Sequence, residues 1–133
     1  MMKPVLIGSG VLAVVVLGAI RWSDTDDDPA QEAGIVLPTL TSVQAEGKAL
    51  FDANCSACHG RNAVGTEQGP PLVHIIYEPN HHGDASFYRA ASLGVRAHHW
   101  RFGNMPAVEG VSEAEVAKII DYVRALQRAN GIR

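Results

Sequence analysis

The stretch CSACH, residues 55–59, decides how the rest of this chain is interpreted, and its two cysteines are the only ones present. A C-x-x-C pair is compatible with a structural or redox disulfide, but a disulfide leaves the adjacent His59 without a role. A zinc site needs further ligands at tight spacing, and no second cysteine pair exists. Covalent haem attachment is the chemistry that uses Cys55, Cys58 and His59 together.

The spacing of the motif follows from the chemistry of attachment. Two thiols add to the two vinyl groups on one edge of the porphyrin, and the imidazole beside the second thiol then lies under the iron. Attachment also needs reduced cysteines and assembly outside the cytoplasm. The motif therefore predicts one covalent haem c per chain, bound through Cys55 and Cys58, with His59 as a ligand of the iron.

Two helices are expected around this motif. Before it, Val43, Gly47, Leu50 and Phe51 share a face at helical spacing, after Thr41 or Ser42 as the N-cap. Near the end of the chain, SEAEVAKIIDYVRALQRANG (residues 112–131) opens with a Ser112–Glu115 capping box and stops at Asn130-Gly131. Its apolar stripe consists of Val116, Ile119, Ile120, Val123 and Leu126.

Several short patterns together resemble a class I c-type monohaem cytochrome over residues 43–133. They are Gly47 and Phe51 before CSACHG, GPPL at 69–72, NMP at 104–106, and a final amphipathic helix with Tyr122. The resemblance implies an all-α fold whose first and last helices pack around the haem and cross closely at Gly47 and Tyr122. It also implies that His59 is the proximal ligand and that the Pro70 carbonyl accepts a hydrogen bond from its other ring nitrogen.

The sixth ligand of the iron is expected in VRAHHWRFGNMPAV, residues 95–108. Met105 is the favoured candidate, because it is neutral, soft and placed in a loop before a proline. A thioether stabilises Fe(II) and raises the reduction potential, which suits electron transfer after quinol oxidation. His98 or His99 would instead give a bis-histidine haem of lower potential, and an open sixth position is a further alternative.

Other residues near this loop suggest secondary roles. Trp100 is expected either to contact the haem or a propionate, or to pack in the core. His81, His82 and Asp84 would form a second metal site with His98 and His99, for copper or zinc, if the fold brings them together. The alternative is separate, solvated histidine pairs. The intervening DASFYRAASLG predicts a helix with Asp84 as N-cap and Gly94 after its end.

The N-terminal region predicts a membrane anchor in residues 1–22. Residues 5–20 carry no charge, Lys3 precedes them, and an acidic run follows within residues 23–42, which we expect to be a flexible linker. The positive-inside rule then places the domain of residues 43–133 outside. We expect one transmembrane helix within residues 4–22 in a bacterial inner membrane, with the haem domain in the periplasm. A cleaved signal peptide is the alternative.

These patterns favour an electron carrier over an enzyme, because catalysis at haem needs an open coordination site and a distal acid–base pair. Expected partners are membrane-bound or periplasmic redox proteins, with a quinol-oxidising donor and an oxidase or reductase as acceptor. A gas-binding haem module and a fixed subunit of a membrane oxidoreductase are the alternatives. Residues 43–133 hold nine basic and nine acidic residues, so no basic excess indicates a nucleic-acid partner.

Overall fold

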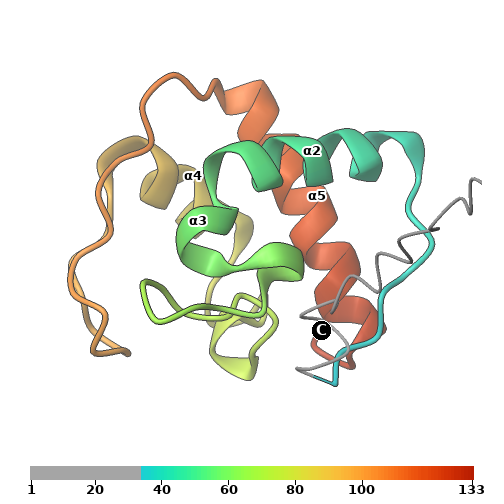
Figure 1. Ribbon diagram of the computed structural model, residues 1–133, viewed down its shortest axis with the longest axis horizontal. Helices are drawn as coiled ribbons and strands as arrows, with labels where there is room; N and C mark the ends of the chain where they lie inside the picture. The colour runs from blue at the N-terminus through green and yellow to red at the C-terminus, as the bar shows by residue number, and fades with distance from the viewer. Residues whose placement is uncertain (1–33) are drawn as a thin grey trace, which may run out of the picture.

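The computed structural model describes residues 34–133, and within that range the chain is mainly helical (Figure 1). The elements in chain order are α2 (Ser42–Asn54), α3 (Ser56–His59), the 3-10 helices η1 (Arg61–Ala63) and η2 (Ile75–Tyr77), α4 (Asp84–Leu93) and α5 (Glu113–Ala129). In this range β pairing is limited to a single bridge between Val95 and Met105. The expected all-α domain is confirmed.

The predicted membrane anchor, residues 1–22, lies outside the described residues, as do residues 23–33 of the predicted linker. Among residues 34–133, no helix combines the length and the apolar character needed to cross a membrane. The N-terminal transmembrane helix therefore stays a prediction.

Helix α2 begins at a reciprocal pair of hydrogen bonds. The hydroxyl of Thr41, one of the two expected caps, accepts from the backbone N–H of Gln44 at 3.3 Å. The backbone N–H of Thr41 donates to the side-chain oxygen of Gln44 at 3.0 Å, which completes a capping box. These bonds satisfy backbone groups that the first helical turn leaves without partners, and so they set the start of α2.

Helices α2 and α5 cross at Gly47. A Cβ atom added there would lie 2.0 Å from the carbonyl oxygen of Lys118 and 3.1 Å from the Cβ atom of Tyr122. One turn later, Phe51 packs edge-on against Tyr122, with ring centroids 5.7 Å apart. The close crossing implied by the resemblance is present. Val43, one turn before the crossing, is 46% exposed, so the buried face of α2 is shorter than predicted.

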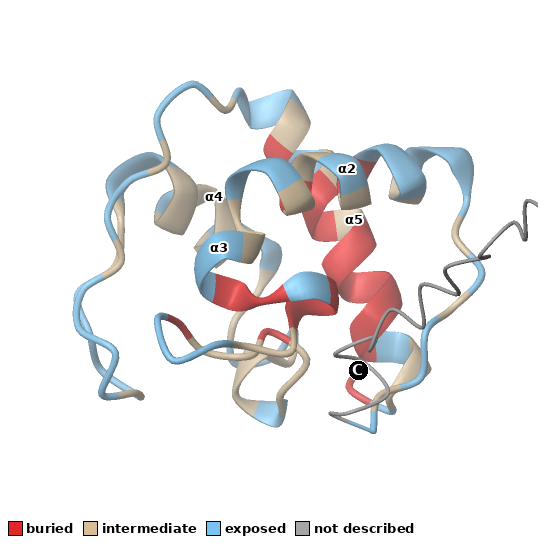
Figure 2. Ribbon diagram, viewed as in Figure 1, coloured by how far each residue is buried: buried red, intermediate tan, exposed pale blue. Residues whose placement is uncertain are grey.

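Helix α5 supplies most of the buried core (Figure 2). It begins with the predicted capping box, in which the Ser112 hydroxyl accepts from the backbone N–H of Glu115, and it ends at Ala129. Every residue of the predicted stripe is buried: Val116, Ile119, Ile120, Val123 and Leu126. Burying each large aliphatic side chain contributes about 1.5–3 kcal/mol. This stripe therefore anchors the other elements.

Two polar side chains of α5, Arg124 and Gln127, are buried beside the stripe. The Arg124 guanidinium donates to the carbonyl oxygens of Tyr77 at 2.7 Å and His82 at 2.5 Å, and to the Asp84 carboxylate at 2.9 Å. The Gln127 amide also donates to the Tyr77 carbonyl, at 3.1 Å. These bonds fasten the irregular segment between η2 and α4 to the long helix.

Helix α4 ends before Gly94 as expected, but its start differs from the prediction. The N-cap is Gly83, and the predicted cap Asp84 is the first helical residue. The Asp84 carboxylate accepts a hydrogen bond from Arg124, which explains why it does not cap the backbone. A carboxylate in the first turn still interacts favourably with the helix dipole.

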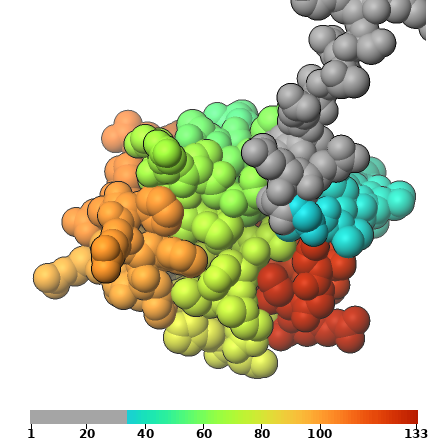
Figure 3. Space-filling view, turned by 60° about the horizontal axis from the view of Figure 1, so that its bottom comes forward, coloured from blue at the N-terminus to red at the C-terminus, as the bar shows by residue number. Residues whose placement is uncertain are grey.

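The residues just before α2 lie against the C-terminal end of α5 (Figure 3). The Val36 N–H donates to the Asn130 side-chain oxygen at 2.7 Å, and the Val36 carbonyl accepts from the Asn130 amide at 2.9 Å. Part of the stretch assigned to the linker is therefore hydrogen-bonded to the domain.

Candidate functional site

The CSACH motif lies where α2 ends and the short helix α3 begins. The Cys55 N–H donates to the Phe51 carbonyl at 2.8 Å, which ends α2, and the His59 N–H donates back to the Cys55 carbonyl at 2.9 Å. The motif is thus wound into a single tight turn. No disulfide joins the two cysteines, of which Cys58 is exposed and Cys55 partly buried. Desolvation, followed by the nearby Cys58, raises the pKa of the Cys55 thiol to about 11.

His59 is held by the loop that follows α3. Its side chain is almost fully buried, and its Nδ1 atom lies 2.9 Å from the carbonyl oxygen of Pro70. A carbonyl can only accept, so Nδ1 carries the hydrogen and Nε2 keeps a free lone pair. Burial lowers the pKa of the His59 imidazole, whereas the bond to Pro70 raises it. A neutral imidazole with a lone pair on Nε2 is the form that binds a metal.

Met105 is positioned by backbone pairing within its own loop. The N–H and carbonyl groups of Val95 and Met105 are joined by two hydrogen bonds of 2.9 Å. A Cβ atom added at Gly94, where φ is +75°, would lie 2.5 Å from the Met105 carbonyl oxygen. Glycine is therefore needed at this position both for its backbone conformation and for the close approach of the loop.

A cavity of about 530 Å³ lies between this loop and the helices. Cys55, His59 and Met105 all line it, although they come from distant parts of the sequence. Its walls are mainly apolar, and they include Phe51, Leu72, Phe87, Val108 and Ile119. Its size lies within the range of about 300–1,000 Å³ that is usual for cofactor and ligand sites. An imidazole, a thioether and a thiol on one apolar cavity are a donor set that fits haem c.

Trp100 also lines the cavity, and its indole N–H has a protein acceptor. It donates to the Tyr77 hydroxyl at 3.1 Å, and the indole packs edge-on against His74. Burial raises the pKa of the Tyr77 hydroxyl, and the bond from Trp100 lowers it. The hydrogen bond connects the Met105 loop to η2, while contact of Trp100 with haem stays a prediction.

Four of the five histidines outside the haem motif lie together beside the cavity: His81, and also His82, His98 and His99, which line it. Ligand atoms of His81, His82 and His99 all lie within 4.8 Å of one another, and the ring centroid of His98 is 4.3 Å from that of His99. The predicted second metal site required the fold to bring the His81–His82 pair and the His98–His99 pair together, and the structure does so. Asp84, the fifth residue of that hypothesis, is paired with Arg124 instead.

The sequence analysis missed Arg124, which joins η2, the His81–His82 turn and α4 to α5. A signal for its burial was present, because Arg124 lies four residues after Ile120, on the edge of the apolar stripe. An arginine on such an edge is ordinarily assigned to solvent. Its acceptors are backbone carbonyls of a segment that is distant in the sequence. No local sequence pattern reveals such acceptors.

Known proteins are similar to this chain over the described domain. The sequence model of the cytochrome c family matches residues 44–127, which is more than half of the chain. Cytochrome bc1 complex cytochrome c subunits of Mycobacterium tuberculosis and Mycobacterium bovis are 27% identical over 133 residues, covering 94% of this chain and 41% of their own length. The Mycobacterium leprae subunit is 29% identical over 131 residues, covering 92% and 39%.

The chain thus spans about two fifths of the length of these curated relatives. The matched family region includes the CSACH motif, the α2–α5 crossing, the Pro70 loop and Met105. With a family match of this extent over the residues that line the cavity, the chain belongs to the cytochrome c family.

Proposed function

We propose that this chain is the haem-carrying part of a membrane-bound respiratory complex, where it passes electrons from a quinol-oxidising donor to an oxidase or reductase. Electron transfer by covalently bound haem c follows from membership of the cytochrome c family. The position within a complex is supported by the similarity to cytochrome c subunits of bc1 complexes. The observation that carries the proposal is one apolar cavity lined by Cys55, His59 and Met105.

Bound haem supplies the electron carrier, since its iron alternates between ferric and ferrous states. The protein would hold it through thioethers from Cys55 and Cys58, and His59 and Met105 would bind its iron. The Pro70 carbonyl fixes the tautomer of His59, so the ring stays oriented in both oxidation states. Apolar walls leave few polar groups free to reorient when the charge of the site changes.

The same proposal gives the chain its place in the cell. An anchor within residues 4–22 would hold the haem domain at the periplasmic face of a bacterial inner membrane. The uncharged run of residues 5–20 and the need to attach haem outside the cytoplasm support this location. A short tether keeps the domain at a high local concentration beside its donor and acceptor.

The test uses the full haem-loaded chain in its native membrane. We expect it to co-purify with a quinol-oxidising enzyme in mild detergent, and its haem to be reduced by quinol and reoxidised by the terminal acceptor within the enzymatic turnover time. A Cys55→Ser, Cys58→Ser variant, which cannot attach haem covalently, is the control and should interrupt this transfer. Reduction by quinol without co-purification would indicate a diffusing carrier and contradict the role as a subunit.

Binding of carbon monoxide to the reduced protein distinguishes an electron carrier from a gas-binding haem module. If Met105 holds the sixth position, the reduced protein should bind CO slowly or not at all, because the thioether must first dissociate. Rapid formation of a CO adduct would contradict the proposal and support a gas-binding haem module.

A further inference from the structure

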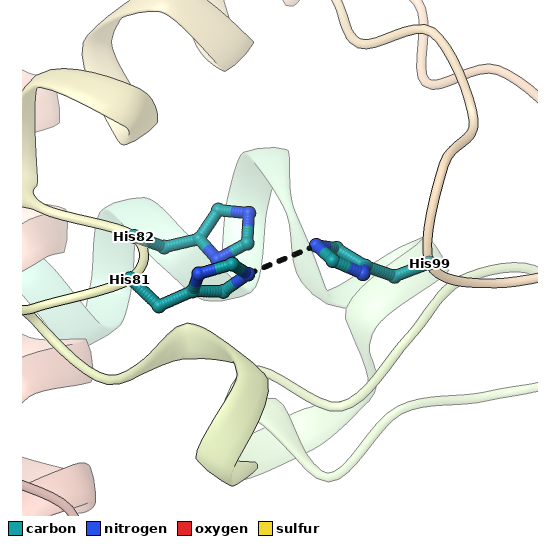
Figure 4. A group of neighbouring side chains, drawn as sticks. All are labelled: His81, His82 and His99. Carbon is teal, nitrogen blue, oxygen red and sulfur yellow. Dashed lines mark hydrogen bonds between the residues drawn. The ribbon is translucent and has the colours of Figure 1, made fainter.

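Three imidazoles converge beside the haem cavity in an arrangement that electron transfer does not require. His81 and His82 come from the turn before α4, and His99 comes from the loop that carries Met105 (Figure 4). The Nε2 atoms of His81 and His99 lie 3.2 Å apart across the gap between these segments. Ligand atoms of all three residues lie within 4.8 Å of one another.

The distance between His81 and His99 resembles the spacing of two ligands on one ion. Zinc–nitrogen bonds of about 2.0–2.1 Å in tetrahedral geometry place the two nitrogens about 3.3–3.4 Å apart. The observed 3.2 Å is close to this value. A small adjustment of exposed side chains would therefore be enough for both rings to bind a common ion.

His82 already has the hydrogen bond that prepares a histidine for metal binding. Its Nδ1 atom lies 2.6 Å from the carbonyl oxygen of Ile76. Since a carbonyl only accepts, Nδ1 carries the hydrogen, and Nε2 is left with a lone pair. Metal-binding histidines usually donate their second ring nitrogen to such an acceptor, which fixes the tautomer and the ring orientation.

The backbone under His82 is held by a buried charge. Arg124, which is 6% exposed, donates to the His82 carbonyl at 2.5 Å and to the Tyr77 carbonyl at 2.7 Å. This anchoring keeps the turn in place before any ion binds, which lowers the ordering cost of binding. Arg124 also forms an ion pair with the Asp84 carboxylate, so Asp84 is not available as a metal ligand. The three imidazoles are then the candidate protein ligands.

The neighbouring imidazoles oppose protonation of His99. Desolvation, followed by the neighbouring His98, His82 and His81 rings, lowers the pKa of His99. Neutral imidazole is the form that binds metal, and imidazole ligands suit Zn²⁺ better than Mg²⁺ or Ca²⁺, which prefer oxygen.

We propose that His81, His82 and His99 bind one Zn²⁺ ion at the rim of the haem cavity, with water in the fourth position. The ion would join the turn before α4 to the loop that carries Met105. It would thereby restrain that loop without taking part in electron transfer. The site rests on the histidine geometry alone and does not depend on the proposed function.

The test is calorimetric titration of ZnCl₂ into the haem-loaded full chain, prepared without a histidine tag and freed of metal by a chelator. We expect one Zn²⁺ per chain. Loss of a supporting hydrogen bond alone weakens metal sites about 10–100-fold, so His81→Asn, His82→Asn and His99→Asn should each weaken binding at least about tenfold. The absorption spectrum of each variant checks that its haem site is intact.

His74→Asn is the matched control, because His74 lies outside the cluster and an Asn side chain can still accept from the Ile76 N–H. Its affinity for Zn²⁺ should equal that of the wild type. Zn²⁺ should also raise the midpoint of thermal unfolding in the wild type and the control, but not in His99→Asn. Equal affinity in the wild type and the cluster variants, or no saturable binding, would overturn the proposal, and neither result would affect the test with quinol.

Discussion

His59 and Met105 show how differently two residues of one site depend on the rest of the chain. His59 is identified by its neighbours alone, because covalent attachment uses contiguous residues. Met105 competes with His98 and His99 in the same short loop, and spacing does not decide among them. The structure pairs the Met105 backbone with Val95 and brings Met105 to the wall of the cavity, which His98 and His99 also line, so Met105 as the ligand stays a prediction.

If Met105 is the sixth ligand of the iron, as proposed, its replacement with alanine should remove that ligand. We expect the weak near-infrared sulfur-to-iron band of the oxidised protein to disappear, and the reduction potential to fall, since a thioether stabilises Fe(II). Absorption spectroscopy and a potentiometric titration of the haem-loaded chain measure both effects.

The control for this change is the double variant His98→Asn, His99→Asn, which keeps Met105. Its near-infrared band and its potential should resemble those of the wild type. If the Met105→Ala spectrum matched the wild type while the double variant differed, one of these histidines would be the ligand.

At the scale of elements, the crossing of α2 and α5 gives the domain its frame. Caps and apolar periodicity predict both helices, because those signals lie within a few residues of each other. The start of α4 was predicted one residue late, since Arg124 binds the Asp84 carboxylate that local chemistry assigns to a cap. Tertiary contacts thus altered a boundary while leaving the helix itself intact.

Gly47→Ala tests the crossing. A methyl group would lie 2.0 Å from the Lys118 carbonyl oxygen, which belongs to the backbone of α5 and cannot rotate away. The helices must then separate, so the free energy of unfolding should fall by about 1–3 kcal/mol, the usual cost of overpacking. Denaturant unfolding of the haem-loaded protein measures the change.

Gly83→Ala is the control, because Gly83 has an ordinary φ of −61° and the nearest contact of an added Cβ atom is 3.4 Å. Its loss of stability should stay below about 1 kcal/mol, as for a weak helix cap. Equal losses in the two variants would show that glycine is not specifically required at the crossing.

For the whole molecule, Arg124 and Gln127 connect α5 to the segment that carries η2 and the His81–His82 turn. That segment is largely irregular, so its backbone groups need partners from elsewhere in the protein. The Arg124 guanidinium supplies donors to the carbonyls of Tyr77 and His82. The apolar side of the haem cavity and its histidine rim are thereby held by one long helix.

Arg124→Met should destabilise the domain, because it removes the donors to the Tyr77 and His82 carbonyls. The Tyr77 carbonyl keeps the Gln127 amide as a donor, whereas the His82 carbonyl and the buried Gln127 Oε1 atom both lose the donor that Arg124 supplies. Leaving a buried acceptor without a donor costs about 1–3 kcal/mol each, so we expect the free energy of unfolding to fall by at least about 2 kcal/mol. Backbone hydrogen exchange should become faster in the turn before α4. Denaturant unfolding measures the change in the free energy of unfolding of the whole domain.

Arg128→Met serves for comparison, since Arg128 is exposed and lies 3.9 Å from Asp121. An exposed pair contributes at most about 1 kcal/mol, and its loss should leave exchange in the turn before α4 unchanged. A similar effect of both substitutions would contradict the role assigned to the buried guanidinium.

The sequence by itself determined the haem motif and the long helices, and it predicted His59 as a ligand of the iron, because each depends on residues that are neighbours along the chain. Only the tertiary structure decided which groups from separate segments meet. It placed Arg124 under His82 and His99 beside His81, and it shows the Pro70–His59 hydrogen bond that the family resemblance implied. Such contacts join residues with no local pattern in common, and they form only when the core has packed these segments against one another.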